Sequence, residues 1–143
     1  MPATQHAWII SHYAEGELKG SELEWVERPL AEPAEGEVLV KTLLLTLDPS
    51  NRVWLSEEED YLPQLQLGDV MRGLVVGRVE ASKHPDFAVG DHVFAALGWQ
   101  EYALVNGDAL SPDNGAVRFT PHPDIPLDAY VSALGLTGWT AYV

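Results

Sequence analysis

The 143 residues contain no cysteine. This absence excludes disulfide bonds, a thiol nucleophile and every cysteine-liganded zinc site. Basic side chains are also scarce: 8 lysines and arginines stand against 22 acidic residues, for a net charge of −14. A surface this acidic repels phosphate groups, so neither nucleic acid nor an anionic membrane surface is an expected partner.

Long apolar runs are missing as well. None approaches the roughly 20 residues that a membrane-spanning helix needs, and the first residues lack the basic and apolar regions of a signal peptide. We therefore expect a cytoplasmic protein without a membrane anchor. The composition, 46% apolar and 21% charged, is typical of a globular protein, and the length predicts one domain.

The sequence also lacks a dinucleotide-binding phosphate loop. No two of its 12 glycines stand two positions apart, so Gly-x-Gly-x-x-Gly does not occur. No strand-loop-helix pattern with an acidic residue about 20 positions further on replaces it. The histidines lack the pair spacing of a zinc site, and no metal is expected; they are His6, His12, His84, His92 and His122.

The segments that are present favour short strands bounded by glycine, proline and asparagine. Gly73 and Gly77 lie inside one β-rich run, where glycine marks a bend or a close backbone approach, with ordinary bulges as the alternative. The pattern predicts a strongly curved sheet or small barrel. The expected strands cover residues 8–10, 23–28, 38–47, 73–81, 92–97 and 100–105.

Residues 38–47 form the most apolar run. Its valine and threonine content favours a strand buried on both faces over a helix. Asp48 and Pro49 then predict the N-cap and first position of a helix. Residues 57–60 are four consecutive acids, which indicate a solvated loop more than a divalent-metal site.

Helical spacing of apolar residues covers residues 127–134, and Gly135 is a natural stop. A second helical pattern begins at Leu136 and continues to Val143 without a capping signal. We therefore expect the chain to be truncated within an element.

Several motifs, in the right order along nearly the whole chain, resemble one known superfamily. Met71-Arg72-Gly73 followed by Val-Val-Gly-Arg-Val and Val-Gly-Asp-His-Val is similar to the GroES-like catalytic domain of medium-chain dehydrogenases/reductases. Within it, the chain most resembles the zinc-free leukotriene B4 dehydrogenase/prostaglandin reductase branch of NADPH-dependent alkenal and enone reductases. The other matching segments are Leu47-Asp48-Pro49 with Arg52, Asp60-Tyr61-Leu62-Pro63, and residues 98–102 and 134–142.

The resemblance implies a mainly β (α+β) fold, a GroES-like partly open β-barrel with short helices, over residues 1–122. Residues 123–143 would begin the helices that lead to an absent Rossmann domain. NADP(H) would be the cofactor, held mainly by that domain, with a small-molecule carbonyl or quinone as substrate. A homodimer of the full-length protein is a further expectation. Met71-Arg72-Gly73 stands where zinc-dependent relatives have Gly-His-Glu, which argues against an alcohol dehydrogenase.

The resemblance also implies site residues. Tyr61 is expected to be catalytic, because a phenol can donate to the enolate oxygen that forms during reduction of an activated C=C bond; a packing tyrosine is the alternative. Asp48 and Arg52 match the segment near the nicotinamide, with a helix cap and an ion pair as the alternative. Ser50 and Asn51 are expected in the substrate pocket. They stand where many relatives have Tyr-Met, which argues against long-chain prostaglandin or leukotriene substrates.

Two further segments complete the expected site. Leu136, Thr137 and Thr140 match the segment that lies against the nicotinamide carboxamide, where hydroxyl and backbone groups orient an amide. A plain helix start is the alternative. Trp99 is expected to wall the substrate pocket or to pack in the core.

The leading prediction for function is the catalytic-domain portion of a zinc-independent NADPH-dependent oxidoreductase that reduces alkenals or enones and is inactive as this chain alone. A quinone oxidoreductase of the same superfamily is the second enzyme hypothesis. A non-enzymatic, protein-binding β-barrel is the alternative from another class.

Overall fold

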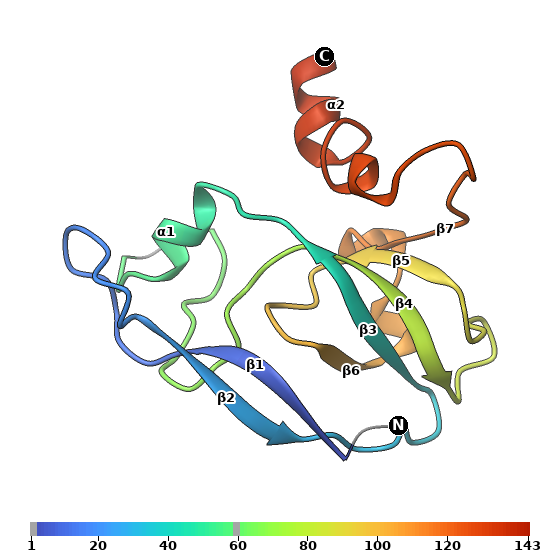
Figure 1. The fold of residues 1–143 in the computed structure, drawn as a ribbon, viewed down its shortest axis with the longest axis horizontal. Coiled ribbons are helices and arrows are strands. Elements are labelled where there is room, and N and C mark those ends of the chain that lie inside the picture. The colour runs from blue at the N-terminus through green and yellow to red at the C-terminus, as the bar shows by residue number, and fades with distance from the viewer. Residues whose placement is uncertain (1–2, 59–60) are drawn as a thin grey trace.

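The computed structural model describes residues 3–58 and 61–143. Within them the strands form two antiparallel sheets (Figure 1). One sheet pairs β1 with β2, and the other has five strands in the order β6-β3-β4-β5-β7. The strands are β1 (Thr4–Ile10), β2 (Leu23–Pro29), β3 (Glu37–Leu45), β4 (Val75–Ser82), β5 (His92–Ala95), β6 (Tyr102–Asn106) and β7 (Val117–Phe119).

Helical structure is limited to short segments. The α-helices are α1 (Ser50–Trp54) and α2 (Leu136–Tyr142), and the 3-10 turns are η1 (Gly107–Ala109), η2 (Pro112–Asn114) and η3 (Leu127–Val131). The predicted mainly β fold is thus confirmed, and in the described part of the chain the two sheets do not close into a barrel. No helix of this part is long and apolar enough to cross a membrane.

Two hydrophobic clusters hold the sheets. The first cluster lies on the five-stranded sheet and contains valines such as Val40, Val75 and Val93. The second joins β1 to α1 through Ile10, Leu55 and buried Met71. Because these apolar side chains leave water on folding, each cluster stabilises the elements that it joins.

The segment at Met71 lies between β1 and the residues before β6. The Met71 N–H donates to the Trp8 carbonyl at 2.8 Å, and its carbonyl accepts from the Trp99 N–H at 2.8 Å. The Gly98 N–H donates to the Gly73 carbonyl at 3.1 Å. These backbone bonds position the Met71-Arg72-Gly73 motif beside the sheets.

The predicted strand over residues 38–47 exists but ends at Leu45. It is fully buried only over residues 38–40, and Leu47 is exposed. The prediction of burial on both faces was therefore wrong for the second half. The reason is that β6 pairs with β3 only as far as Lys41, so the rest of β3 continues past the edge of its neighbour.

Gly77 bears out both the close backbone approach and the alternative of a bulge. It pairs with β3 next to a register shift between Thr42 and Leu44. A Cβ built on Gly77 would collide with the Val40 Cγ1 and lie 2.9 Å from the Lys41 carbonyl oxygen. Only glycine lets the two strands come this close.

The predicted helix start was wrong in its cap. Pro49 is the N-cap of α1 and Ser50 its first residue. The Asp48 carboxylate does not cap the helix, because its Oδ2 accepts the Thr46 hydroxyl at 2.6 Å. The Asn51 side chain reaches back instead, and its Oδ1 accepts the Asp48 N–H at 2.6 Å.

Two other segments differ from expectation in extent. The helical spacing over residues 127–134 produces only the 3-10 turn η3, because the Ser132 hydroxyl and the Leu134 N–H fold back onto the carbonyls of Asp128 and Ala129. The acidic run at 57–60 lies partly outside the described residues, and its first two members are exposed. The helix from Leu136 is confirmed as α2.

Candidate functional site

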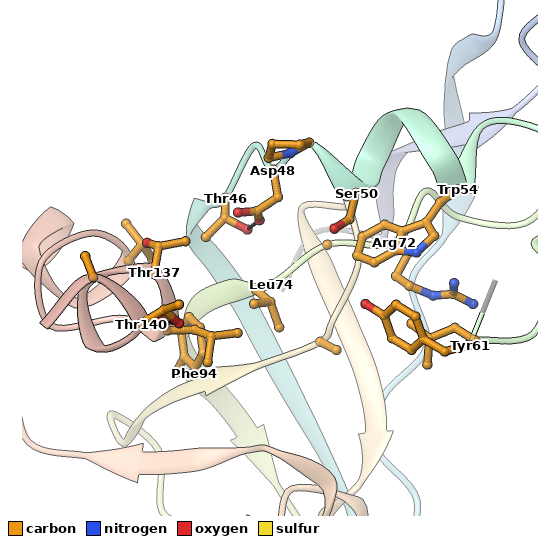
Figure 2. A pocket seen from close by; sticks show the side chains of 17 residues that line it. Thr46, Asp48, Ser50, Trp54, Tyr61, Arg72, Leu74, Phe94, Thr137 and Thr140 are labelled. Carbon is orange, nitrogen blue, oxygen red and sulfur yellow. Dashed lines mark hydrogen bonds between the residues drawn. The ribbon is translucent and has the colours of Figure 1, made fainter. Parts of the chain in front are cut away.

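A cavity of about 650 Å³ opens between α1, β5 and α2 (Figure 2). Apolar side chains form most of its wall. Leu74 and Phe94 line it from the larger sheet, and Val131, Leu136 and Ala141 line it from the C-terminal segment. A cavity of this size, apolar with a few polar groups, is typical of a small-molecule site.

The residues that follow β3 supply polar side chains to this cavity. Thr46 and Asp48 both line it, and the 2.6 Å hydrogen bond from the Thr46 hydroxyl fixes one carboxylate oxygen. Ser50, the first residue of α1, lines the same wall. The carboxylate is half-buried and can accept a further hydrogen bond from a ligand amide.

Tyr61 lines the cavity, and its hydroxyl points into it (Figure 2). The side chain is 79% exposed. A packing tyrosine would be buried around its ring, so this exposure argues against that alternative. The catalytic role itself stays a prediction.

The two threonines of α2 line the cavity from the side away from Tyr61 (Figure 2). The Thr140 hydroxyl donates to the Leu136 carbonyl at 2.8 Å. Its proton is therefore used within the helix, while its oxygen can still accept. Within residues 3–58 and 61–143 the Thr137 hydroxyl has no hydrogen-bond partner, so it can both donate and accept. Together with Asp48, this set of donors and acceptors fits the amide of a nicotinamide ring.

Two of the predicted site residues on α1 lie outside the cavity. The Arg52 Nη2 donates to the Gly16 carbonyl at 2.6 Å, in a loop 36 residues earlier. Asn51 is buried, and its Nδ2 donates to the Arg72 carbonyl at 3.1 Å. Both side chains therefore hold neighbouring segments together outside the cavity. The ion pairs of the described residues do not include one between Asp48 and Arg52, which was the alternative.

Trp99 does not line the cavity either. Its ring lies behind Gly73, where a Cβ on the glycine would be 2.6 Å from the indole Cδ1. Its indole nitrogen is buried and finds no hydrogen-bond partner in the described part of the chain. Trp99 instead borders a separate hollow of about 350 Å³ together with Trp8 and Trp25.

The lining residues that the sequence reasoning did not assign to the site include Thr46, Trp54, Arg72 and Phe94. Arg72 stood inside the Met71-Arg72-Gly73 motif, so a signal was present for it. Among the described lining residues, only Asp48 and Arg72 carry charged side chains. No group of three or more His, Cys, Asp or Glu that could hold a metal ion occurs in the same part of the chain.

Comparison with known proteins places this site in a family. Residues 6–112 match the family described as the N-terminal domain of oxidoreductase. NADPH-dependent curcumin reductase from Escherichia coli (strain K12) is 37% identical over 136 residues, which are 95% of this chain and 37% of that protein. The 2-alkenal reductase (NADP(+)-dependent) from Nicotiana tabacum is 32% identical over 138 residues, 94% of this chain and 38% of that protein.

The crystal structure of CurA from Vibrio vulnificus superposes with a TM-score of 0.82 at 29% identity and covers 96% of this chain and 39% of that chain. A second structure of CurA, in complex with NADPH, superposes equally well. The chain thus spans about two fifths of the length of these relatives. These 143 residues belong to the family of oxidoreductase N-terminal domains, and their predicted place among the zinc-independent medium-chain dehydrogenases/reductases is confirmed.

Proposed function

We propose that this cavity is the substrate side of an NADPH-dependent oxidoreductase that reduces activated C=C bonds of alkenals and enones. The observation that carries the proposal is the arrangement of polar groups around an apolar space. Tyr61 lies at one end, and Asp48, Thr137 and Thr140 line the wall away from it. Relatives named as NADPH-dependent and 2-alkenal reductases support it.

Tyr61 would act on the substrate carbonyl. As the β-carbon gains a hydride, negative charge develops on the carbonyl oxygen, and a hydroxyl aimed at that oxygen stabilises the enolate. A proton then adds at the α-carbon, so one hydride and one proton convert the C=C bond into a C–C single bond. Leu74 and Phe94 would form an apolar wall against which the carbon skeleton of the substrate packs.

The residues around α2 would orient the cofactor. When bound, the dinucleotide supplies the hydride. The carboxylate of Asp48 and the hydroxyl oxygen of Thr140 would accept from the carboxamide NH₂, and the Thr137 hydroxyl would donate to its carbonyl. Because the sequence has no phosphate loop, we propose that residues of a longer parent protein hold the pyrophosphate.

The test is NADPH oxidation with a simple enal, measured for this chain and for a longer protein that contains it. We expect turnover only in the longer protein. Turnover by the 143 residues alone would contradict the proposed division of the site. Reduction of quinones but not enals would favour a quinone oxidoreductase, and no turnover of either would favour a binding protein.

The role of Tyr61 has its own test in the active protein. Tyr61→Phe removes only the hydroxyl, and the loss of one such donor lowers kcat by about 10²- to 10³-fold. Tyr102→Phe is the matched control, because Tyr102 lines the separate hollow beside Trp99. An unchanged kcat in Tyr61→Phe would refute the assignment.

A further inference from the structure

Arg72 connects three parts of the cavity wall. Its Nη2 donates to the Pro63 carbonyl at 2.8 Å, and its guanidinium carbon lies 5.3 Å from the centroid of the Trp54 ring in α1. Its own backbone carbonyl accepts from the Asn51 Nδ2 at 3.1 Å. The side chain is half-buried and lines the cavity itself.

The segment that carries Tyr61 needs such a connection. No helix or strand occurs in the described residues between Trp54, the end of α1, and Val75, the start of β4. The proposed chemistry requires the Tyr61 hydroxyl to be held to a fraction of an ångström.

The bond to Pro63 supplies a restraint at short range. Pro63 is two residues after Tyr61, and two extended residues span at most about 7 Å. Fixing the Pro63 carbonyl therefore confines the Tyr61 backbone to a small volume beside the cavity. Figure 2 shows Arg72, Trp54 and Tyr61 together at one end of the cavity, away from Thr137 and Thr140.

We propose that Arg72 is a positioning residue, which ties the segment at residues 61–63 to its own backbone beside Trp54 and so holds the Tyr61 hydroxyl at the substrate. This inference rests on the proposed function. Arginine suits the role because its flat guanidinium stacks on an indole face while its edge donates to a carbonyl. Lysine can donate to Pro63 but cannot stack in this way, and methionine cannot donate at all.

This restraint can be tested on this chain without any activity. Backbone ¹⁵N order parameters are measured for the amides of Tyr61, Leu62 and Gln64, since Pro63 has no N–H, in the wild type, Arg72→Met and Arg72→Lys. In Arg72→Met we expect the values to fall from about 0.85 to below about 0.6, with Arg72→Lys between them. Amides in β3 and β4 should keep their wild-type values.

Arg78→Met is the matched control, because Arg78 pairs with Glu80 on the exposed face of β4 and its loss should leave residues 61–64 ordered. Unchanged order at residues 61–64 in Arg72→Met would overturn the proposal. An equal loss of order throughout β3 and β4 would also overturn it, because Arg72 would then be a general stabilising residue.

A double-mutant cycle in a longer, active protein tests whether Arg72 acts through Tyr61. A misplaced catalytic group costs up to about 10²-fold in rate, so we expect Arg72→Met to lower kcat by about that factor when Tyr61 is present. In the Tyr61→Phe background the same change should cost less than about 2-fold, because coupled residues are not additive.

Equal losses in both backgrounds would overturn the positioning role. If Tyr61→Phe leaves kcat unchanged while Arg72→Met disorders residues 61–64, the restraint is supported and only the catalytic role of Tyr61 fails. The two proposals can therefore fail separately.

Discussion

Gly73→Ala tests the packing that separates the cavity from the hollow behind it. The added methyl would lie 2.6 Å from the Trp99 Cδ1, about 0.8 Å inside the 3.4 Å at which ordinary contact begins. Gly73 does not have a positive φ, so the backbone accepts alanine and the cost is purely steric. The ring must therefore move.

The magnitude follows from where the ring can go. Inserting one methyl into a packed site costs about 1–3 kcal/mol. Trp99 packs on the cluster that contains Ile10 and Met71, but it also borders the hollow of about 350 Å³. Because the ring can yield toward that hollow, we expect the lower half of the range, about 1–2 kcal/mol, which lowers Tm by roughly 4–8 °C for a chain of this length.

The assay is equilibrium unfolding in urea followed by tryptophan fluorescence, with the midpoint falling and the slope m unchanged. The control is the same change in a Trp99→Leu background, where the steric conflict is gone and the expected cost is below about 0.5 kcal/mol. An unchanged midpoint in Gly73→Ala, or an equal loss in both backgrounds, would refute the reasoning.

Two further predictions concern buried polar groups. Backbone N–H groups, first that of Lys19 and then those of Glu22 itself and Gly20, hold the pKa of the Glu22 carboxylate below the usual 4.5. Its stabilising contribution is therefore present above that pH and is lost as the pH falls through the lowered pKa. Glu22→Gln should therefore be less stable than wild type in urea at pH 7. The difference should shrink as the pH falls through the lowered pKa of Glu22; a difference independent of pH would contradict this. Asn51→Leu should cost about 1–3 kcal/mol in the same assay, because the Asp48 N–H and the Arg72 carbonyl lose their partner; a loss below about 0.5 kcal/mol would count against that account.

Local patterns were enough to predict most of the elements. Alternating or continuous apolar runs bounded by glycine and proline predicted β1 to β6 to within a few residues, because side-chain alternation and chain breakers act over neighbouring positions. The short β7 was not predicted. It has only three residues, two of them exposed, so it leaves no periodic signal.

Local patterns failed to predict side-chain roles where several partners compete for one side chain. Asp48 had the right residue type for an N-cap, but the Thr46 hydroxyl competes for its carboxylate. Arg52 had the right position in a motif, but the Gly16 carbonyl, 36 residues earlier, takes its guanidinium. Residue type and spacing do not encode which of several partners is within reach.

The sequence by itself determined the class of protein. The order of the motifs, which resemble those of medium-chain dehydrogenases/reductases, placed the chain among zinc-independent oxidoreductase domains, and the missing cysteines excluded cysteine-liganded zinc. Only the tertiary structure decided which motif residues share one cavity. Successive helical residues point about 100° apart, so α1 turns Ser50 toward the cavity and Asn51 and Arg52 away from it. Arg72 reaches Trp54 and the Pro63 carbonyl only because the folded backbone brings these segments together, a contact that no local pattern specifies.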